Sequence, residues 1–178
     1  MEVRGGNGYI EEWVNPRLVR DAHIGVLWEG TSNVNALDAI SRAVAKEHAD
    51  HEFKSYLLER MDETEHLPAA FAARLRAGVD RAFALAERVA RSPGNEQLAR
   101  VAATALYNVA SAVMLAWEGT RPGFDARRAL VARMVLEHRI EATDPLAPRD
   151  DAWEKEAIAL LIDPTPVPRD RAMSLLAA

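Results

Sequence analysis

The chain has 178 residues, of which 49% are hydrophobic and 28% are charged, the composition of a globular domain with an ordinary core. It has no cysteine, which excludes disulfides, thiolate nucleophiles, zinc–thiolate centres and iron–sulfur clusters. Its formal net charge of -5 argues against a protein that is basic overall and coats nucleic acid. Because the start also lacks the pattern of a targeting leader, we expect a cytoplasmic location and no membrane anchor.

Two glycine-containing segments distinguish the first 35 residues from the rest. Gly-Gly-Asn-Gly-Tyr occupies positions 5–9, and Glu-Gly-Thr-Ser-Asn occupies positions 29–33. Glycine lets the backbone turn sharply or approach a ligand closely. Between the two segments, Arg17-Leu18 and Arg20-Asp21-Ala22 predict a short helix. A second helix is predicted over 31–47, where a hydroxyl side chain at its start can act as the cap.

In order and spacing, these elements resemble the closing signature of the acyl-CoA dehydrogenase family over about residues 2–43. Trp28 before the Glu-Gly pair, together with the long helical tail, is similar to the alkylation-response or isovaleryl-CoA dehydrogenase-like branch. The resemblance implies an all-α fold, in which a helical bundle from the C-terminal part of the family fold continues into a helical extension. It also implies an oxidoreductase that uses FAD to oxidise an acyl-CoA thioester.

The resemblance assigns roles to individual positions. Glu29 falls on the catalytic base, which removes a proton from the carbon next to the thioester carbonyl while a hydride leaves the next carbon for the flavin. Gly30 falls on a residue that touches the acyl-CoA substrate. The positions implied to contact the cofactor are Gly5 and Gly6, at the adenosine diphosphate end of a flavin held mainly by a neighbouring subunit, and Thr31, Ser32 and Asn33 along the flavin.

The chemistry favours the same choice of base. Removing a weakly acidic carbon proton needs a carboxylate in a dry pocket, where desolvation brings its pKa nearer to the working pH. It also needs a flexible neighbour, so that the substrate can come close. Glu29, between Trp28 and Gly30, has both features. On its own, a glutamate at this position would be an exposed helix-end carboxylate, so the assignment depends on the whole signature.

The remainder of the chain predicts helices separated by short loops. Polar residues and Pro68 over 49–68 predict a junction. A stripe at helical spacing predicts an amphipathic helix over 71–91, with these residues on its buried side: Phe71, Leu75, Val79, Ala82, Phe83, Ala86 and Ala90. We therefore divide the chain into residues 1–48 (the end of the family domain), 49–68 (the junction) and 69–178 (the extension).

Three further helices are predicted in the extension. One runs from about Glu96 to Trp117 and is apolar around most of its circumference, so we expect neighbours to wrap it. The next, over 125–141, has Leu130, Val131, Met134 and Val135 facing inward and Arg128, Arg133 and Glu137 facing outward. The third, over 151–162, buries Trp153, Ala157, Leu160 and Leu161. Together the helices predict a bundle.

The tetrapeptide Trp-Glu-Gly-Thr occurs a second time, at 117–120. Here it ends a long helix, so Gly119 is expected just past the helix terminus, and Glu118 is expected to have a structural role. The histidines never pair at metal-binding spacing. His48 and His51 lie three residues apart but lack a third ligand, so we predict no metal site.

Large parts of the complete family fold have no counterpart in this sequence. We therefore expect a C-terminal fragment that is inactive on its own and binds FAD weakly or not at all. We also expect a homo-oligomer, because the apolar face of the 31–47 helix, with Val34, Leu37, Ile40 and Val44, would lack its partners. The alternative function is a nucleic-acid-binding or oligomerisation module, suggested by the many arginines of the extension.

Overall fold

The computed structural model describes residues 2–28, 30–64, 66–92, 94–142, 144, 146–147 and 152–177. Every element within these ranges is helical, which confirms the predicted all-α fold. In chain order the elements are η1 (Glu2–Gly8), α1 (Asn15–Trp28), α2 (Ser32–Asp38), η2 (Ala39–Val44), α3 (Ala49–Asp62), α4 (Ala69–Arg91), η3 (Glu96–Leu98), α5 (Ala99–Thr120), α6 (Arg127–Val135), η4 (Leu136–Ile140), α7 (Ala152–Ile162) and α8 (Arg169–Ala177).

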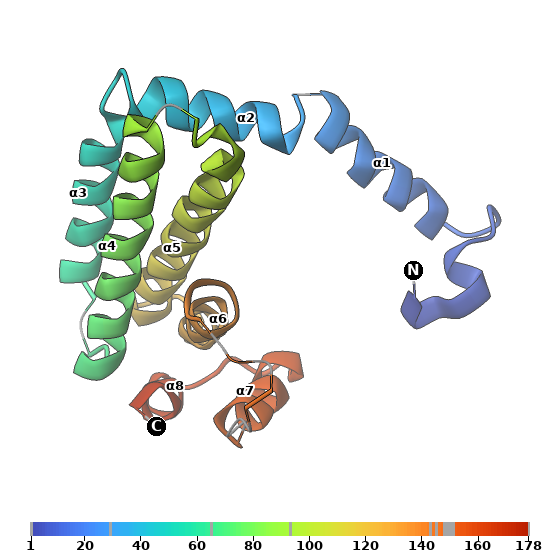
Figure 1. Ribbon diagram of the computed structural model, residues 1–178. Helices are drawn as coiled ribbons and strands as arrows, with labels where there is room; N and C mark the ends of the chain where they lie inside the picture. Colours follow the sequence, from blue (N-terminus) through green and yellow to red (C-terminus); the bar gives the residue numbers. More distant parts are fainter. Residues whose placement is uncertain are drawn as a thin grey trace.

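The helices from α3 onward form a bundle, and the front segment extends away from it (Figure 1). Helices α3, α4 and α5 lie side by side, and α6 packs against α5. Helix α2 continues directly into the π-helical η2, and the pair crosses one end of the bundle. Helices α7 and α8 lie at the opposite end, where α8 contacts α4 and α6.

The main core lies between α3, α4, α5 and α6. The predicted stripe of α4 is buried there, since Phe71, Leu75, Val79 and Phe83 are almost inaccessible to solvent. The partners of this stripe on the other helices are Leu57, Val109, Val113, Leu130 and Leu136. The 3.6-residue period of α4 therefore predicted its buried side correctly. Ala90, at the end of the stripe, is only partly buried.

A smaller core joins the front segment to the bundle. Ile40 and Val44 of η2 pack against Ala86 and Val89 of α4, with Ala99 and Ala102 of α5 completing the cluster. The expectation that the face bearing Val34, Leu37, Ile40 and Val44 lacks partners was therefore wrong for Ile40 and Val44. Only Val34 and Leu37 remain exposed. Burial of one such aliphatic side chain contributes about 2 kcal/mol.

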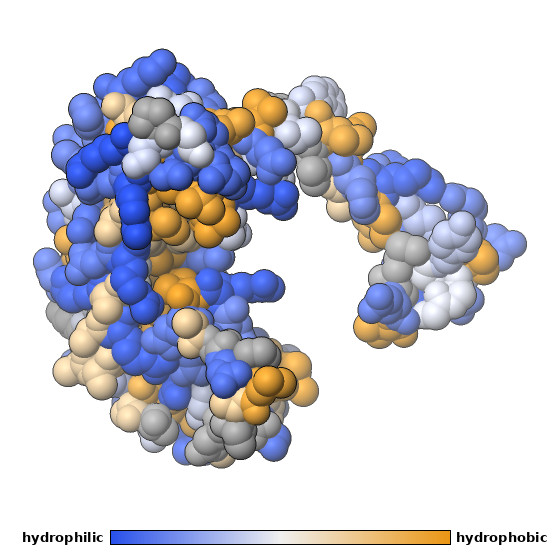
Figure 2. Space-filling model, viewed as in Figure 1, coloured by the Kyte–Doolittle hydropathy of each residue, from blue (hydrophilic) through white to orange (hydrophobic). Residues whose placement is uncertain are grey.

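The exposed apolar surface lies instead on η1 and α1. Leu18, Leu27 and Trp28 are 55%, 72% and 77% exposed, and further apolar side chains follow the same segment in Figure 2. An exposed apolar surface of this size is typical of a site that contacts another part of a protein or a second subunit.

Most of the expected junction at 49–68 is helix. Helix α3 begins at Ala49, and its Leu57 and Met61 are buried in the main core. Of the polar residues that suggested a junction, His51, Glu52 and Asp62 lie on the solvent side of this helix, whereas Asp50 is buried. The described residues here without helix are 63–64 and 66–68, and Pro68 directly precedes α4.

Helix α5 is only partly wrapped by its neighbours. Its predicted core role is confirmed at Ala102, Val109 and Ala112, which are buried. However, Val101 and Tyr107 are 55% and 70% exposed, so one face remains open, contrary to the expectation of neighbours on all sides. By length and composition alone, the segment Glu96–Thr120 could cross a membrane, a test that core helices of soluble proteins also pass.

Gly119 lies inside α5, where we had expected it past the helix end. The helix continues to Thr120 because α6 packs closely against this turn. A Cβ at Gly119 would lie 2.5 Å from the backbone nitrogen of Ala129. Glu118 forms an ion pair with Arg128, with Oε2 3.0 Å from Nε, in keeping with its expected structural role.

Substitution of Gly119 by alanine is therefore expected to destabilise the bundle. The new methyl group would collide with backbone, so α5 and α6 would have to separate, at a cost of about 2–3 kcal/mol. The free energy of unfolding in urea measures this loss. Gly25→Ala is the matched control, because its Cβ would meet nothing within 4 Å. Equal stability of the two variants would contradict the close approach of α5 and α6.

Arg133 and Glu137 were expected to face outward, but both are largely shielded from solvent. The side chains are 7% and 12% exposed, and Nε of Arg133 lies 2.8 Å from Oε1 of Glu137. Arg74 donates to the same carboxylate from α4 at 2.9 Å. The guanidinium of Arg133 also lies 3.9 Å from the ring centre of Trp153. The prediction failed because α7 and α8 cover this face of α6.

Two arginines of α6 also hold the tail of the chain through backbone carbonyls. Arg127 donates to the carbonyl oxygens of Leu161, Asp163 and Thr165 at 3.4, 3.1 and 2.8 Å. Arg133 donates to the carbonyl oxygen of Leu175 in α8. The strap between α7 and α8 is thus fixed to α6 by main-chain contacts.

Glu137→Gln is expected to lower stability at pH 7 by about 2 kcal/mol, because two charge-assisted hydrogen bonds are weakened. Burial raises the pKa of Glu137, but hydrogen bonds from Arg133 and Arg74 outweigh burial, so its net pKa lies below 4.5. This contribution is present above the unfolded-state pKa and is lost as the pH falls through the lower folded-state pKa. Urea unfolding from pH 7 to pH 3 should therefore show a smaller acid-induced loss for the variant.

The matched control for this measurement is Glu47→Gln, which alters an exposed ion pair with Arg42. Exposed pairs contribute little, so this control should behave like the unmodified chain. An identical pH profile for Glu137→Gln and the unmodified chain would show that the Glu137 carboxylate does not stabilise the bundle.

Candidate functional site

The predicted site begins with the glycine pair in η1. Gly5 has φ 54° and ψ -136°, a backbone conformation that residues with side chains rarely adopt. A Cβ at Gly5 or Gly6 would meet nothing within 4 Å, so both backbones are open to an approaching ligand. This geometry fits the backbone contact with the adenosine diphosphate end of FAD that the resemblance implies.

The segment between the glycine pair and the predicted base is held by an ion pair at its start. Both guanidinium nitrogens of Arg20 donate to the carboxylate of Glu11, at 2.7 and 3.1 Å. The hydrogen bond from Arg20 is the main cause that lowers the pKa of Glu11. Glu11 was not identified in the sequence, although Arg20 belongs to the signature. The pair joins α1 to the loop that follows η1, although both side chains are largely exposed.

Glu29, the predicted catalytic base, lies outside the described residues. Its neighbour Gly30 adopts φ 88°, and a Cβ there would lie 3.1 Å from Oδ1 of Asn35. Asn35 donates from Nδ2 to the carbonyl oxygen of Gly30 at 3.4 Å. The backbone conformation at position 30 therefore favours glycine, and a Cβ there would press on the amide of Asn35.

Helix α2 begins directly after this glycine. Thr31 is its N-cap residue, and its Oγ1 accepts a hydrogen bond from the backbone nitrogen of Val34 at 3.4 Å. The predicted hydroxyl cap is thus Thr31, while Ser32 is the first residue of the helix. Asn33 follows and accepts a hydrogen bond from Arg100 of α5, with Nη1 and Oδ1 3.4 Å apart. Arg100 lies 67 residues along the chain from Asn33, so no local pattern could have identified it.

A groove begins at this contact and continues along the open face of α5. Its volume is about 950 Å³, and its lining includes Asn33, Leu37, Arg100, Val101, Thr104 and Asn108. Apolar side chains gather over this part of α5 in Figure 2. The predicted flavin-lining helix and the helical extension therefore form one concave surface.

The structure does not bring all the predicted cofactor contacts together. Gly5 and Gly6 lie at the far end of α1 from Thr31, Ser32 and Asn33 (Figure 1). Helix α1 has 14 residues, which corresponds to about 21 Å. The positions that the resemblance assigns to the cofactor therefore lie in two separate places on one chain.

Comparison with known families identifies the class of the front segment. Residues 1–45 match the family model "Acyl-CoA dehydrogenase, C-terminal domain". This part of the chain is therefore of the acyl-CoA dehydrogenase type, and the resemblance found in the sequence is confirmed. The alkylation-response or isovaleryl-CoA dehydrogenase-like branch stays a prediction.

Three relatives carry names from the same family. Acyl-CoA dehydrogenase family member 11 of Caenorhabditis elegans is 44% identical over 48 residues, 27% of this chain and 8% of that protein. Butyryl-CoA dehydrogenase of Syntrophomonas wolfei is 30% identical over 124 residues, 64% of this chain and 19% of that protein. AidB of Escherichia coli, which is named as an acyl-CoA dehydrogenase, is 48% identical over 40 residues, 22% of this chain and 7% of that protein.

These matches span less than a fifth of the length of each relative. The match to the Syntrophomonas protein is much longer than the 45 residues of the family model, so it reaches well into the helical extension. No solved structure matches the chain significantly.

The cap of α2 can be tested directly. Thr31→Ala removes the side-chain acceptor for the backbone nitrogen of Val34 and should lower the free energy of unfolding by about 0.5–1 kcal/mol. Thr31→Ser keeps the hydroxyl and is the matched control. Urea unfolding followed by circular dichroism measures both variants. If alanine and serine at this position give equal stability, Thr31 does not stabilise α2 through its hydroxyl.

Proposed function

We propose that this chain supplies the catalytic-base loop and a helical support for an FAD-dependent acyl-CoA dehydrogenase. The observation that carries the proposal is the match of residues 1–45 to the C-terminal domain of that family. Gly30, with its positive φ, and the helix start at Thr31 follow directly after Glu29, which supports a base at that position. The reaction is the α,β-dehydrogenation of an acyl-CoA thioester.

In this proposal the chain's own residues contact the substrate and the flavin, and one of them accepts a proton. Glu29 accepts the proton from the carbon next to the thioester carbonyl. Gly30 leaves room for the substrate beside the base, because no side chain projects there. Thr31, Ser32 and Asn33 line the flavin, which supplies a hydride acceptor when bound.

The extension acts as the support for this loop. Helix α2 packs on α5, and η2 packs on α4 and α5, so the segment after the base is fixed to the bundle. The similarity to butyryl-CoA dehydrogenase reaches beyond residue 45, which favours an extension that works with the dehydrogenase segment. We propose that the chain alone is inactive and that the complete enzyme is a homo-oligomer.

The ion pairs of the extension favour this role over nucleic-acid binding. Six of the arginines that suggested a basic surface lie within 4 Å of carboxylates: Arg74, Arg76, Arg91, Arg127, Arg128 and Arg133. An arginine already paired to a carboxylate contributes less to attracting phosphate. Their arrangement is that of interhelical and local ion pairs.

The base is tested in the complete protein that contains this segment. Glu29→Gln keeps the shape of the side chain but cannot accept a proton, so the turnover of acyl-CoA should fall by at least about 100-fold. Flavin content and thermal stability should stay close to those of the unmodified enzyme. The measurement is acyl-CoA-dependent reduction of an electron acceptor.

Glu118→Gln is the matched control, because the same tetrapeptide, Trp-Glu-Gly-Thr, surrounds it. This variant should keep its turnover, since Glu118 pairs with Arg128 far from α2. Full turnover by Glu29→Gln with the best acyl-CoA substrate would rule out Glu29 as the base.

A further inference from the structure

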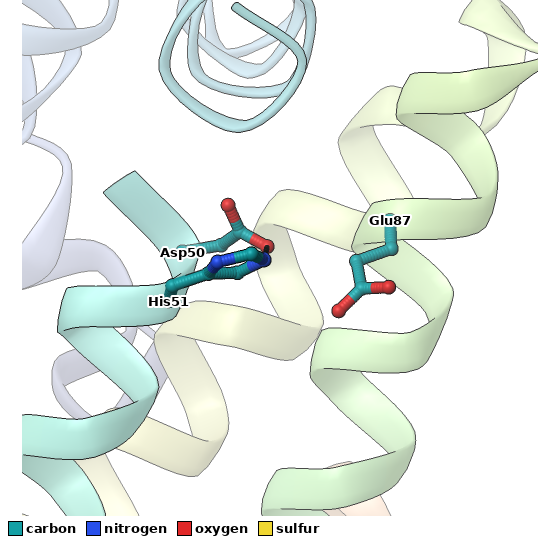
Figure 3. A group of neighbouring side chains, drawn as sticks. All are labelled: Asp50, His51 and Glu87. Carbon is teal, nitrogen blue, oxygen red and sulfur yellow. Dashed lines mark ion pairs between the residues drawn. The ribbon is translucent and has the colours of Figure 1, made fainter. Parts of the chain in front are cut away.

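Three side chains with metal-binding atoms meet where α3 begins beside α4. Asp50 and His51 lie on the first turn of α3, and Glu87 lies on α4, 36 positions beyond His51. One candidate ligand atom from each residue lies within 4.8 Å of the others. Figure 3 shows the Asp50 carboxylate beside the imidazole of His51, with Glu87 approaching from the neighbouring helix.

Asp50 is unusual because it is buried without a hydrogen bond. Its side chain is only 3% exposed, and Oδ1 has no hydrogen-bond partner. Its Oδ2 is 3.8 Å from Nε2 of His51, too far for a hydrogen bond. A buried carboxylate without partners is costly, and a bound ion is one recognised reason for such a group.

We propose that Asp50, His51 and Glu87 bind a divalent transition-metal ion, best matched by Zn²⁺. One imidazole and two carboxylates are ligands that zinc commonly accepts, and water can complete a tetrahedral site. Zinc bonds of about 2.1 Å place tetrahedral ligand atoms about 3.4 Å apart. The ligand atoms therefore need to draw together by up to about 1.4 Å, which rotation of the exposed His51 and Glu87 side chains can provide.

The two outer ligands have that freedom. The His51 side chain is 69% exposed, and the Glu87 side chain is 32% exposed. Glu87 accepts a hydrogen bond from Arg91 at 2.7 Å, but Arg91 is 75% exposed, and such a surface pair contributes little. The cation Lys54, on the next turn of α3, pairs with Asp80 at 2.7 Å, so its charge is already matched.

A metal at this position would cross-link the first turn of α3 to the C-terminal part of α4. The chain reaches that turn directly from η2, so the ion would fix the connection between the front segment and the bundle. The sequence did not predict this site, because His48 and His51 lacked a third ligand in their own segment. Folding supplies one from α4. This inference is independent of the proposed enzymatic function.

The test is titration of ZnCl₂ into the full 178-residue chain after removal of metals by a chelator, followed by calorimetry. One Zn²⁺ per chain is expected. His51→Ala and Glu87→Gln should each weaken binding by at least about tenfold. Asp50→Asn should also weaken zinc binding. If the Asp50 carboxylate served only to stabilise the start of α3, this substitution would leave the zinc affinity unchanged. Arg91→Ala frees Glu87 and should tighten binding or leave it equal.

Two controls keep the result interpretable if a variant is unstable. His23→Ala removes an exposed histidine of α1, which contacts the carbonyl oxygen of Val19, and should bind zinc like the unmodified chain. Zinc should raise the melting temperature of the unmodified chain and of His23→Ala, but not that of His51→Ala. The proposal is overturned by equal zinc binding in His51→Ala and the unmodified chain, by no binding, or by a preference for Mg²⁺ over Zn²⁺.

Discussion

The burial of Ile40 and Val44 between α4 and α5 is the interaction on which the position of the candidate site depends. Elements η1 and α1 contact each other and expose most of their apolar side chains. The position of α2 after Gly30 is therefore set by the contacts that α2 and η2 make with α4 and α5. The small second core makes the extension a rigid base for the dehydrogenase segment, and Arg100 adds a polar contact at Asn33.

Local patterns predicted much of this architecture. The stripe of Phe71, Leu75, Val79 and Phe83 predicted the buried side of α4, because a long amphipathic helix leaves only one solution for its apolar face. The hydroxyl of Thr31 predicted the start of α2 for a similarly local reason, since a cap acts within one turn. For the site, sequence similarity assigned roles to positions 5, 6 and 29–33. The structure gives the backbone conformations at Gly5 and Gly30, and the role of Glu29 stays a prediction.

The predictions that failed concern contacts between distant segments. Arg133 and Glu137 look like solvent-facing residues when their own helical segment is considered alone. Trp153 and the carbonyl of Leu175 contact Arg133, and Arg74 of α4 contacts Glu137. Gly119 looks like a helix terminator, yet it lies inside α5, where the backbone packs closely against Ala129 of α6. In each case the deciding neighbour is a different helix, and single-helix periodicity contains no information about it.

The way in which α6 holds the tail has a consequence for sequence variation. Arg127 and Arg133 bind main-chain carbonyls at positions 161, 163, 165 and 175, and a carbonyl is present whatever the residue. Apart from Asp163, whose carboxylate accepts a hydrogen bond from the Thr165 nitrogen, and the buried Val167, the side chains between α7 and α8 can vary without loss of these contacts. The length of the strap is constrained, because an insertion or deletion would shift these carbonyls away from the guanidinium groups of Arg127 and Arg133. Homologous tails should therefore diverge in composition sooner than in length.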